Sequence, residues 1–268
     1  MEEMYYDECR ELYREQYRIE KSIPHGKDIR VFLAVDEKSG KRVVLKEYLA
    51  EILTPDFYNS IKSGIELLTR IDHPSVPHPE LIMEADSLLL KMKYNVGRDL
   101  RMITSRSGAL DPCLVREWAI QVCDALQCMH ALNPPVLYLA LTPSNLFLTS
   151  EYQIIFVETV QMMEKGKDTG VHFIGYRGYV APEQFGGNMG LDERTDIYGF
   201  GTTFYHLLTG KSPAETGYVI LPLRQLNPSL AGSRWEKIIA KCCQPDPRKR
   251  YKNCDELMKD LKKLPTAK

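Results

Sequence analysis

The hydrophobic pattern predicts a different kind of structure in successive parts of the chain. Residues 1–16 place apolar side chains at mostly three- and four-residue steps among charges, which predicts an amphipathic helix. Residues 17–93 contain β-branched and aromatic runs broken by turn residues, which predicts an antiparallel sheet. One helix, at 56–71, interrupts these strands, with Thr54 or Asp56 as its expected N-cap. The first third of the chain therefore forms a small, mainly β region.

The pattern becomes mainly helical after Gly97. Apolar residues recur at helical spacing in four later stretches, 112–132, 195–209, 233–244 and 254–264. The sequence thus predicts an α+β, bilobal protein, with a small antiparallel β lobe at 17–93 and a larger, mainly α lobe at 99–268. The segment 94–98 is the expected hinge, and no internal repeat or low-complexity segment indicates a further joint.

Composition and charge narrow the class of partner. With 44% hydrophobic residues in 268, the chain is long and apolar enough to bury a sizeable core. Its 35 lysines and arginines nearly balance its 36 aspartates and glutamates, so no global field draws it onto nucleic acid or an anionic membrane. We therefore expect a partner that is recognised locally, and no nucleic-acid partner.

The cysteines and the first residues indicate the cellular compartment. The seven cysteines have neither a C-x-x-C spacing nor the density of a small disulfide scaffold, which predicts reduced thiols. The stretch MEEMYYDECREL is acidic and polar where a secretory signal would be basic and then apolar, and no run of about 18 apolar residues is present to span a bilayer. We expect a cytoplasmic chain, whether or not it is one part of a longer protein.

Five segments carry a family resemblance. They are VVLK ending at Lys46, YLALTPSNLFL at 138–148, GYVAPEQF at 178–185, TDIYGFGTTFYHLLTG at 195–210 and QPDPRKRY at 244–251. Each segment alone is a weak signal, but the set in this order and spacing is specific. From about Tyr17 to Leu264 the chain resembles a eukaryotic-like serine/threonine protein kinase of the prokaryotic type. The resemblance implies a bilobal protein-kinase-like fold.

The segment that resembles the catalytic loop lacks its chemistry. Phosphoryl transfer needs a base near the acceptor hydroxyl, metal ligands and a lysine on the phosphates. Where the family has His-Arg-Asp-Leu-Lys, residues 138–142 read Tyr-Leu-Ala-Leu-Thr, so the methyl group of Ala140 replaces the proton-accepting carboxylate. Thr142 replaces the loop lysine, and Tyr176 stands where the family offers a threonine to the same cluster. Tyr138 says little, because active prokaryotic relatives often have tyrosine there.

The resemblance also implies altered metal and phosphate sites. The family's Asp-Phe-Gly falls on 158–160, where Glu158 keeps a carboxylate that is one methylene longer. Magnesium demands near-ideal octahedral geometry, so this change weakens the expected metal–phosphate bridge. The glycine-rich turn keeps one of three glycines, Gly26, as a candidate phosphate contact. The helix glutamate that would pair with Lys46 falls on Gly64, which removes that ion pair.

Lys46, Asn145 and Glu158 remain as candidate nucleotide-binding residues. The strand-ending Lys46 is either a residual phosphate contact or a relic with a solvated charge. Asn145 either holds a second metal or, the role we favour, satisfies local backbone groups. Val44 and Phe147 add volume toward the adenine pocket, where their burial competes with the ligand. We expect weak or absent ATP binding and no catalytic metal site.

Three other residues resemble structural parts of the family. Glu183 and Arg250 resemble the buried ion pair that ties the activation segment to the C-lobe, and Asp196 resembles the aspartate that anchors the catalytic-loop backbone. We interpret the chain as a pseudokinase, a non-enzymatic regulatory or scaffolding module whose partner is a protein such as an active kinase or another signalling protein. Two alternatives stay open: a non-standard kinase-fold transferase that uses ATP, and an ATP-binding sensor without turnover.

Overall fold

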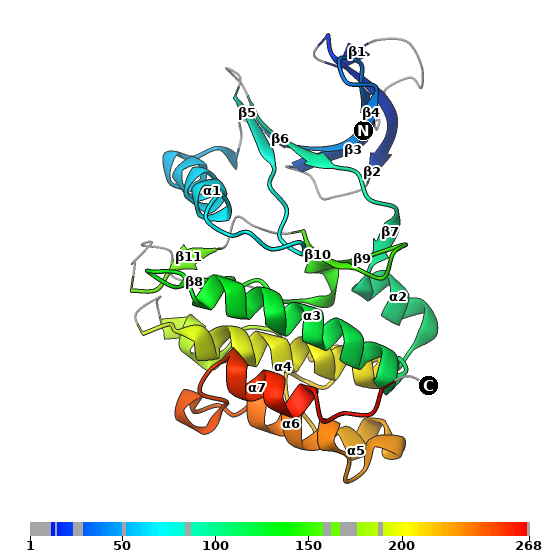
Figure 1. The fold of residues 1–268 in the computed structure, drawn as a ribbon, viewed down its shortest axis with the longest axis vertical. Coiled ribbons are helices and arrows are strands. Elements are labelled where there is room, and N and C mark those ends of the chain that lie inside the picture. Colours follow the sequence, from blue (N-terminus) through cyan, green and yellow to red (C-terminus); the bar gives the residue numbers. More distant parts are fainter. Residues whose placement is uncertain are drawn as a thin grey trace. The chain divides into compact units, whose positions relative to one another are not determined.

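The computed structural model describes residues 12–13, 15–23, 29–49, 52–83, 87–157, 162–166, 176–186 and 190–266. Contacts within the chain define two compact units, whose elements are labelled in Figure 1. The first unit contains Met1–Ile65 and Pro77–Val96, and the second contains Glu66–Val76 and Gly97–Lys268. The first holds a large antiparallel sheet and the second is mainly helical, which confirms the α+β class.

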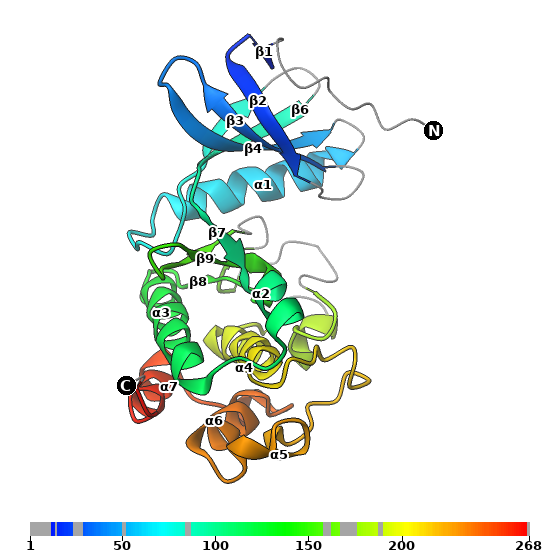
Figure 2. The ribbon, with the colours of Figure 1, turned by 90° about the vertical axis from the view of Figure 1, so that its right-hand side faces the viewer.

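A six-stranded antiparallel sheet forms the body of the first unit (Figure 2). Its strand order is β1-β2-β3-β4-β6-β5. The strands are β1 (Leu12–Tyr13), β2 (Tyr17–Ile23), β3 (Ile29–Asp36), β4 (Lys41–Leu49), β5 (Glu80–Met83) and β6 (Ser87–Lys93). Lys46 lies in the central strand β4, opposite Val31 on one side and Leu90 on the other. Alternate inward residues of these strands form the core of this sheet, including Phe32, Ala34, Leu45 and Leu89.

Helix α1 (Pro55–Leu68) begins in the first unit. Of the two expected caps, Thr54 is the one used, because its hydroxyl accepts a hydrogen bond from the amide of Phe57 at 3.2 Å. The ring of Phe57 then meets the ring of Tyr48 edge-on, with centroids 5.7 Å apart. This contact places the start of α1 on the face of the sheet to which Tyr48 belongs.

The structure corrects two parts of the expected domain division. Leu12–Tyr13 form a strand paired with β2 instead of part of a helix over 1–16, because Glu15 adopts a φ of 56° and reverses the chain. Residues 1–11 and 14 lie outside the described residues. Residues 66–76 belong to the second unit instead of the lobe at 17–93, because their apolar side chains are buried in the second unit's core.

The second unit contains the four helices that the sequence predicts over 112–132, 195–209, 233–244 and 254–264. They are α3 (Pro112–His130), α4 (Glu193–Thr209), α6 (Arg234–Cys242) and α7 (Cys254–Leu261). Shorter helices are α2 (Leu100–Ser107), α5 (Leu223–Leu226), η2 (Pro143–Asn145), η3 (Pro182–Gly186), η4 (Pro228–Leu230) and η5 (Pro247–Lys249). Short strands are β7 (Gly97–Asp99), β8 (Val136–Leu137), β9 (Leu146–Thr149), β10 (Ile154–Phe156) and β11 (Met163–Glu164). Within the described ranges, every helix is too short or too polar to traverse a lipid bilayer.

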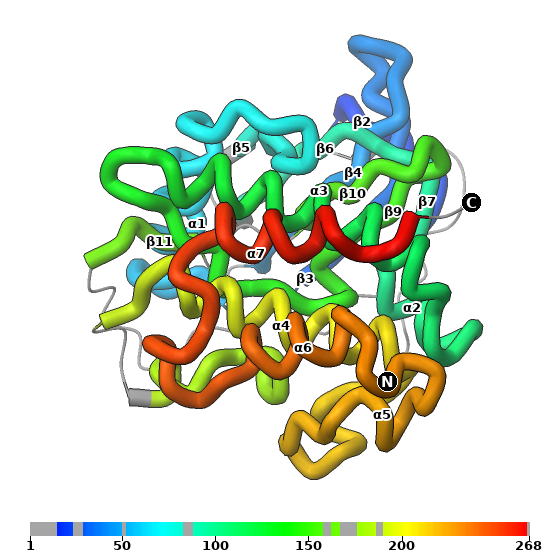
Figure 3. Tube along the Cα trace, turned by 60° about the horizontal axis from the view of Figure 1, so that its bottom comes forward, coloured from blue at the N-terminus to red at the C-terminus, as the bar shows by residue number. Residues whose placement is uncertain are grey.

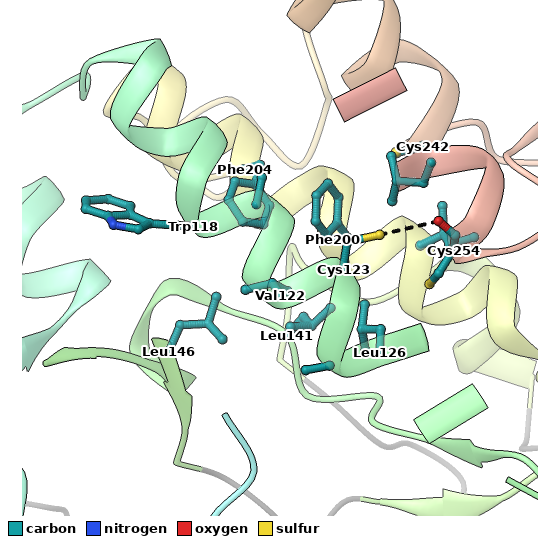
Figure 4. Close-up of a cluster of buried hydrophobic side chains, with 14 of the residues drawn as sticks. Trp118, Val122, Cys123, Leu126, Leu141, Leu146, Phe200, Phe204, Cys242 and Cys254 are labelled. Atoms are coloured by element: carbon teal, nitrogen blue, oxygen red, sulfur yellow. Dashed lines mark hydrogen bonds between the residues drawn. The ribbon is translucent and has the colours of Figure 1, made fainter. Parts of the chain in front are cut away.

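The core of the second unit supports the loop between β8 and β9. Figure 4 shows side chains from α3 and α4 meeting in this core, with Phe200 and Phe204 only 4.3 Å apart between ring centroids. Leu141, in the middle of the loop, and Leu146, at the start of β9, are buried in the same cluster. The loop therefore lies on a close-packed base and has little freedom to move relative to α4.

Helix α4 is buried along nearly its whole length. It begins with a capping box, in which the Asp192 side chain accepts from the backbone of the first turn and the Thr195 hydroxyl oxygen accepts from the Asp192 backbone amide at 3.3 Å. Gly210, at a φ of 69°, ends it in the left-handed conformation that glycine adopts without strain. A fixed start and a buried body make α4 a rigid support for Asp196, one of two acidic residues in its first turn.

Candidate functional site

The loop at residues 138–145 is anchored by the carboxylate of Asp196. Its two oxygens accept hydrogen bonds from the backbone amides of Tyr138 at 2.8 Å and Leu139 at 2.7 Å. Leu139 adopts a φ of 61°, a strained conformation that these bonds help to hold. The side chain of Asp196 is fully buried, so its lost hydration is replaced by these donors. Asp196 thus has the loop-anchoring role that the sequence predicts.

A third donor to Asp196 is His130, in the last turn of α3. The His130 Nε2 atom lies 2.9 Å from the Asp196 carboxylate, and its Nδ1 atom lies 3.5 Å from the Cys254 sulfur. Burial alone lowers the pKa of His130, but the hydrogen bonds with Asp196 and Cys254 outweigh burial and raise the pKa to about 10. The pair is therefore a buried imidazolium and carboxylate at neutral pH.

The position of the expected base carries a buried methyl group. Ala140 is 1% exposed, and its carbonyl accepts a hydrogen bond from the Asn145 side-chain amide at 2.7 Å. The Thr142 hydroxyl accepts from the Asn145 backbone amide at 3.3 Å and caps η2. The polar groups of Thr142 and Asn145 are thus used to shape the turn, and the favoured structural role of Asn145 agrees with this geometry.

A small pocket lies beside the loop. Its wall is formed by Leu139, Leu141, Tyr176, Tyr179, Val180, Gln184, Thr195, Asp196 and Gly199. Among the described residues of this wall, Asp196 is the one carboxylate, and its oxygens already accept the three hydrogen bonds described above. The carboxylate of Asp196 is thus used to fix the loop.

Tyr138 and Tyr176 have different surroundings. Tyr138 is fully buried, and its ring meets Phe156 edge-on at 4.7 Å between centroids. Tyr176 is 38% exposed and lines the mouth of the pocket, while Thr142 is buried within its own turn. The structure therefore gives Tyr138 a packing role and brings Tyr176 to the surface of the pocket.

The ion pair that the sequence predicts between Glu183 and Arg250 is present. The Arg250 guanidinium donates to both Glu183 oxygens, at 2.6 and 2.9 Å. Its other three N–H groups donate to the backbone carbonyls of Gln244, Arg194 and Pro245. All five donors of this fully buried side chain are satisfied. The pair joins η3 to the start of α4 and to the segment before α7.

Lys46 belongs to the first unit, where the structure corrects its expected surroundings. Strand β4 continues to Leu49, so Lys46 does not end the strand, and it is 7% exposed instead of solvated. Its ammonium lies 5.1 Å from the centre of the Tyr48 ring, a cation–π contact. In α1, position 64 is a buried glycine, so that helix offers no carboxylate there. The side chain of Lys46 is therefore buried on the same face of the sheet as Tyr48.

The remaining predicted site residues are only partly described. Glu158 and Gly26 lie outside the described residues. Asn145, in the second unit, is the one predicted metal-binding residue whose surroundings the structure gives, and it supplies a single amide oxygen, since its NH₂ group donates to Ala140. One neutral oxygen does not fit a divalent cation that requires several oxygen ligands, so the described donors do not make a metal site by themselves.

His130 is not among the residues singled out from the sequence. Its position in the last turn of a predicted helix could have indicated a role, because the helix dipole favours a protonated histidine there. What the sequence alone did not reveal is that the turn of α3 lies against the first turn of α4, which is 66 residues further along the chain.

Comparisons with known proteins identify relatives along most of the chain. Residues 17–261 match the sequence model of the protein kinase domain. A probable serine/threonine-protein kinase of Clostridium acetobutylicum is 25% identical over 263 residues, covering 92% of this chain and 39% of the relative. A probable serine/threonine-protein kinase, PknB, of Corynebacterium glutamicum is 27% identical, covering 75% and 32%. The serine/threonine-protein kinase ATG1a of Arabidopsis thaliana is 26% identical, covering 74% and 32%. The chain thus spans about two fifths or less of these relatives.

The buried ion pair leads to a stability prediction with a neighbouring control. Arg250→Ala removes the guanidinium from Glu183, whose carboxylate keeps a hydrogen bond from the Thr195 hydroxyl, and is expected to lower the free energy of unfolding by about 3–5 kcal/mol. Arg248→Ala removes an arginine whose side chain is 84% exposed, and is expected to cost far less. Urea unfolding of both variants measures the difference. Equal losses would show that the Arg250 pair does not hold the fold.

The His130 pair predicts how stability depends on pH. Its pKa is about 10 in the folded protein and about 6.5 in an unfolded chain, so its stabilisation is complete below about pH 6.5 and is lost as pH rises through about 10. His130→Gln should lower the free energy of unfolding by about 1.5–3 kcal/mol at pH 6. We expect this loss to shrink steadily toward pH 10.

Urea unfolding at several pH values checks the His130 prediction, with His78→Gln as the control at an exposed histidine. The control difference should stay small at every pH. A His130→Gln loss that is the same at pH 6 and at pH 10 would contradict a buried imidazolium.

Proposed function

The chain belongs to the protein kinase domain family, and from that premise we propose that it is a pseudokinase, a non-catalytic module that regulates or scaffolds a partner protein. The observation that carries the proposal is Ala140, a buried methyl group at the loop position where the family resemblance places the base. A methyl group neither accepts the proton of an acceptor hydroxyl nor orients that hydroxyl.

The surroundings of Ala140 support the proposal, because the described residues supply no replacement base. Asp196, the acid in the wall of the neighbouring pocket, is committed to the loop backbone and to His130. Thr142 stands in place of a lysine, and its hydroxyl caps the turn, so it brings no positive charge to a transferring phosphoryl group. The backbone of the loop is held in place, but the loop lacks the carboxylate and the lysine that the family has at positions 140 and 142.

We further propose that nucleotide binding is weak or absent. Lys46 persists, but the helix position from which a glutamate would orient it is Gly64, and its ammonium contacts Tyr48 instead. In the second unit, the Asn145 side-chain amide donates to the carbonyl of Ala140 and so helps to shape the loop. Both residues thus have structural contacts within their own unit, which favours a structural role over nucleotide binding.

The retained structural pairs favour a binding role. The bonds that hold Glu183 to Arg250 and Asp196 to the loop involve neither nucleotide nor metal. The surfaces that these elements carry are therefore fixed without a catalytic cycle, as a scaffold requires. We propose a cytoplasmic module whose partner is a protein, such as an active kinase or another signalling protein.

A phosphotransfer assay tests the proposal. The purified chain is incubated with γ-labelled ATP and magnesium or manganese, with generic protein acceptors, beside the matched variant Lys46→Ala. We expect label in protein at the same background for both proteins. Ala140→Asp should also stay at background, because Thr142 and Gly64 remain. Label that Lys46→Ala abolishes would overturn the proposal and favour the non-standard transferase.

Thermal unfolding with ATP, ADP and each divalent metal separates the remaining alternative. A ligand that binds only the folded state raises the unfolding temperature by mass action. Our proposal expects no shift that depends on a divalent metal. A metal-dependent shift with no phosphotransfer would instead identify an ATP-binding sensor without turnover.

A further inference from the structure

Positive charge is concentrated in the last part of the sequence. Residues 234–268 carry eleven lysines and arginines against five aspartates and glutamates, a net charge of +6. Because the whole chain has a net charge of −1, residues 1–233 carry −7. A near-neutral total therefore hides a strongly asymmetric distribution, which is the kind of asymmetry that steers an oppositely charged partner.

Helix α6 presents a stripe of three cations. Arg234, Lys237 and Lys241 follow one another at steps of three and four residues, so they lie along one face of the helix. The other face, which includes Trp235 and Ile238, is buried in the core. The Lys241 ammonium lies 3.9 Å from the centre of the Tyr251 ring, a contact that holds one end of the stripe in place.

Helix α7, which neighbours α6, carries further exposed cations. Figure 3 shows α6 and α7 beside each other on the same face of the second unit. The exposed cations of α7 and its flanking residues are Lys252, Lys259, Lys262 and Lys263. We call these four residues and the α6 stripe together the basic face. Among the described residues, only Lys263 of these seven forms an ion pair, with Asp260 at 2.8 Å.

The carboxylates of this region are mostly occupied by local bonds. Glu236 accepts from the backbone amides of Gly232 and Arg224, which lowers its pKa. Asp260 accepts from the Tyr251 hydroxyl and from Lys263. These acids cap turns and fix side chains, so they neutralise few of the cations that face outward.

The chemistry of the basic face selects one class of partner. Its aromatic residues Trp235 and Tyr251 are buried, and no exposed large hydrophobic residue occurs within the described part of 234–268. The face therefore offers nothing to stack on unpaired bases and nothing to insert into a bilayer. A partner protein can place one carboxylate opposite each cation, which a uniformly anionic surface does not do.

We propose that the basic face binds an acidic α-helix of a partner protein, whose carboxylates recur at the three- and four-residue spacing of Arg234, Lys237 and Lys241. Two helices side by side bring such stripes into register, so each cation meets one carboxylate. The proposal concerns residues other than those of the loop at 138–145. It does not depend on whether the chain transfers phosphoryl groups.

A designed peptide tests the proposal. The probe is a fluorescently labelled helical peptide with glutamates at positions i, i+3 and i+7, and its partner peptide has glutamines there. Fluorescence anisotropy measures binding to the whole chain at low and at near-physiological salt. We expect the glutamate peptide alone to bind, with affinity that falls as salt rises.

Two charge-matched variants locate the binding surface. Arg234→Glu with Lys237→Glu should weaken binding of the glutamate peptide at least about tenfold, because two attractions become repulsions. Lys38→Glu with Lys41→Glu makes the same charge change at exposed positions of the first unit and should leave affinity within about twofold. Urea midpoints close to that of the unaltered chain establish that both variants are folded.

Three results would overturn the proposal. The first is equal weakening in the two charge-matched variants, and the second is no binding of the glutamate peptide even at low salt. The third is tighter binding to phosphatidylserine vesicles or to duplex DNA, which would assign the face to a membrane or to nucleic acid. None of these results alters the phosphotransfer outcome, so failure here is distinct from failure of the proposed function.

Discussion

The buried carboxylate of Asp196 is the interaction on which the shape of the loop depends. It accepts from two consecutive backbone amides and from His130, so one side chain of α4 connects the loop to the end of α3. A buried carboxylate is tolerated only because each lost contact with water is replaced. Removing any of these donors would leave part of the desolvation cost of the carboxylate uncompensated. The need to satisfy Asp196 therefore fixes the conformation of the loop, including the position of Ala140.

The residues that hold the fold and those that would perform chemistry are therefore separable in this chain. Arg250 satisfies all five of its donors in the interior, and Asp196 satisfies its oxygens, without any help from positions 140, 142 or 64. The methyl group of Ala140 takes part in no buried polar pair, whereas loss of Arg250 would take the guanidinium away from Glu183. Under the function that we propose, this difference in cost accounts for a kinase-family fold around a loop without its base.

The sequence predicted the parts whose signals are local or belong to a motif. Helix α4 and the pairing of Glu183 with Arg250 both follow from residues within recognisable segments, and the sequence narrowed the cap of α1 to Thr54 or Asp56. It failed where a distant neighbour decides the outcome. Leu12–Tyr13 form a strand because β2 is beside them, and Lys46 is buried because the strand continues past it. His130 acquires its role only from a helix that is far away in sequence.

Hydrogen exchange at two amides tests the anchoring of the loop most directly. If Asp196 holds the loop, the amides of Tyr138 and Leu139 exchange as slowly as that of Val122, in the middle of α3. In Asp196→Asn, one charged acceptor is lost, so exchange at both amides should accelerate at least about tenfold relative to Val122. If the two amides keep their wild-type ratio to Val122 in that variant, Asp196 does not anchor the loop and the account is wrong.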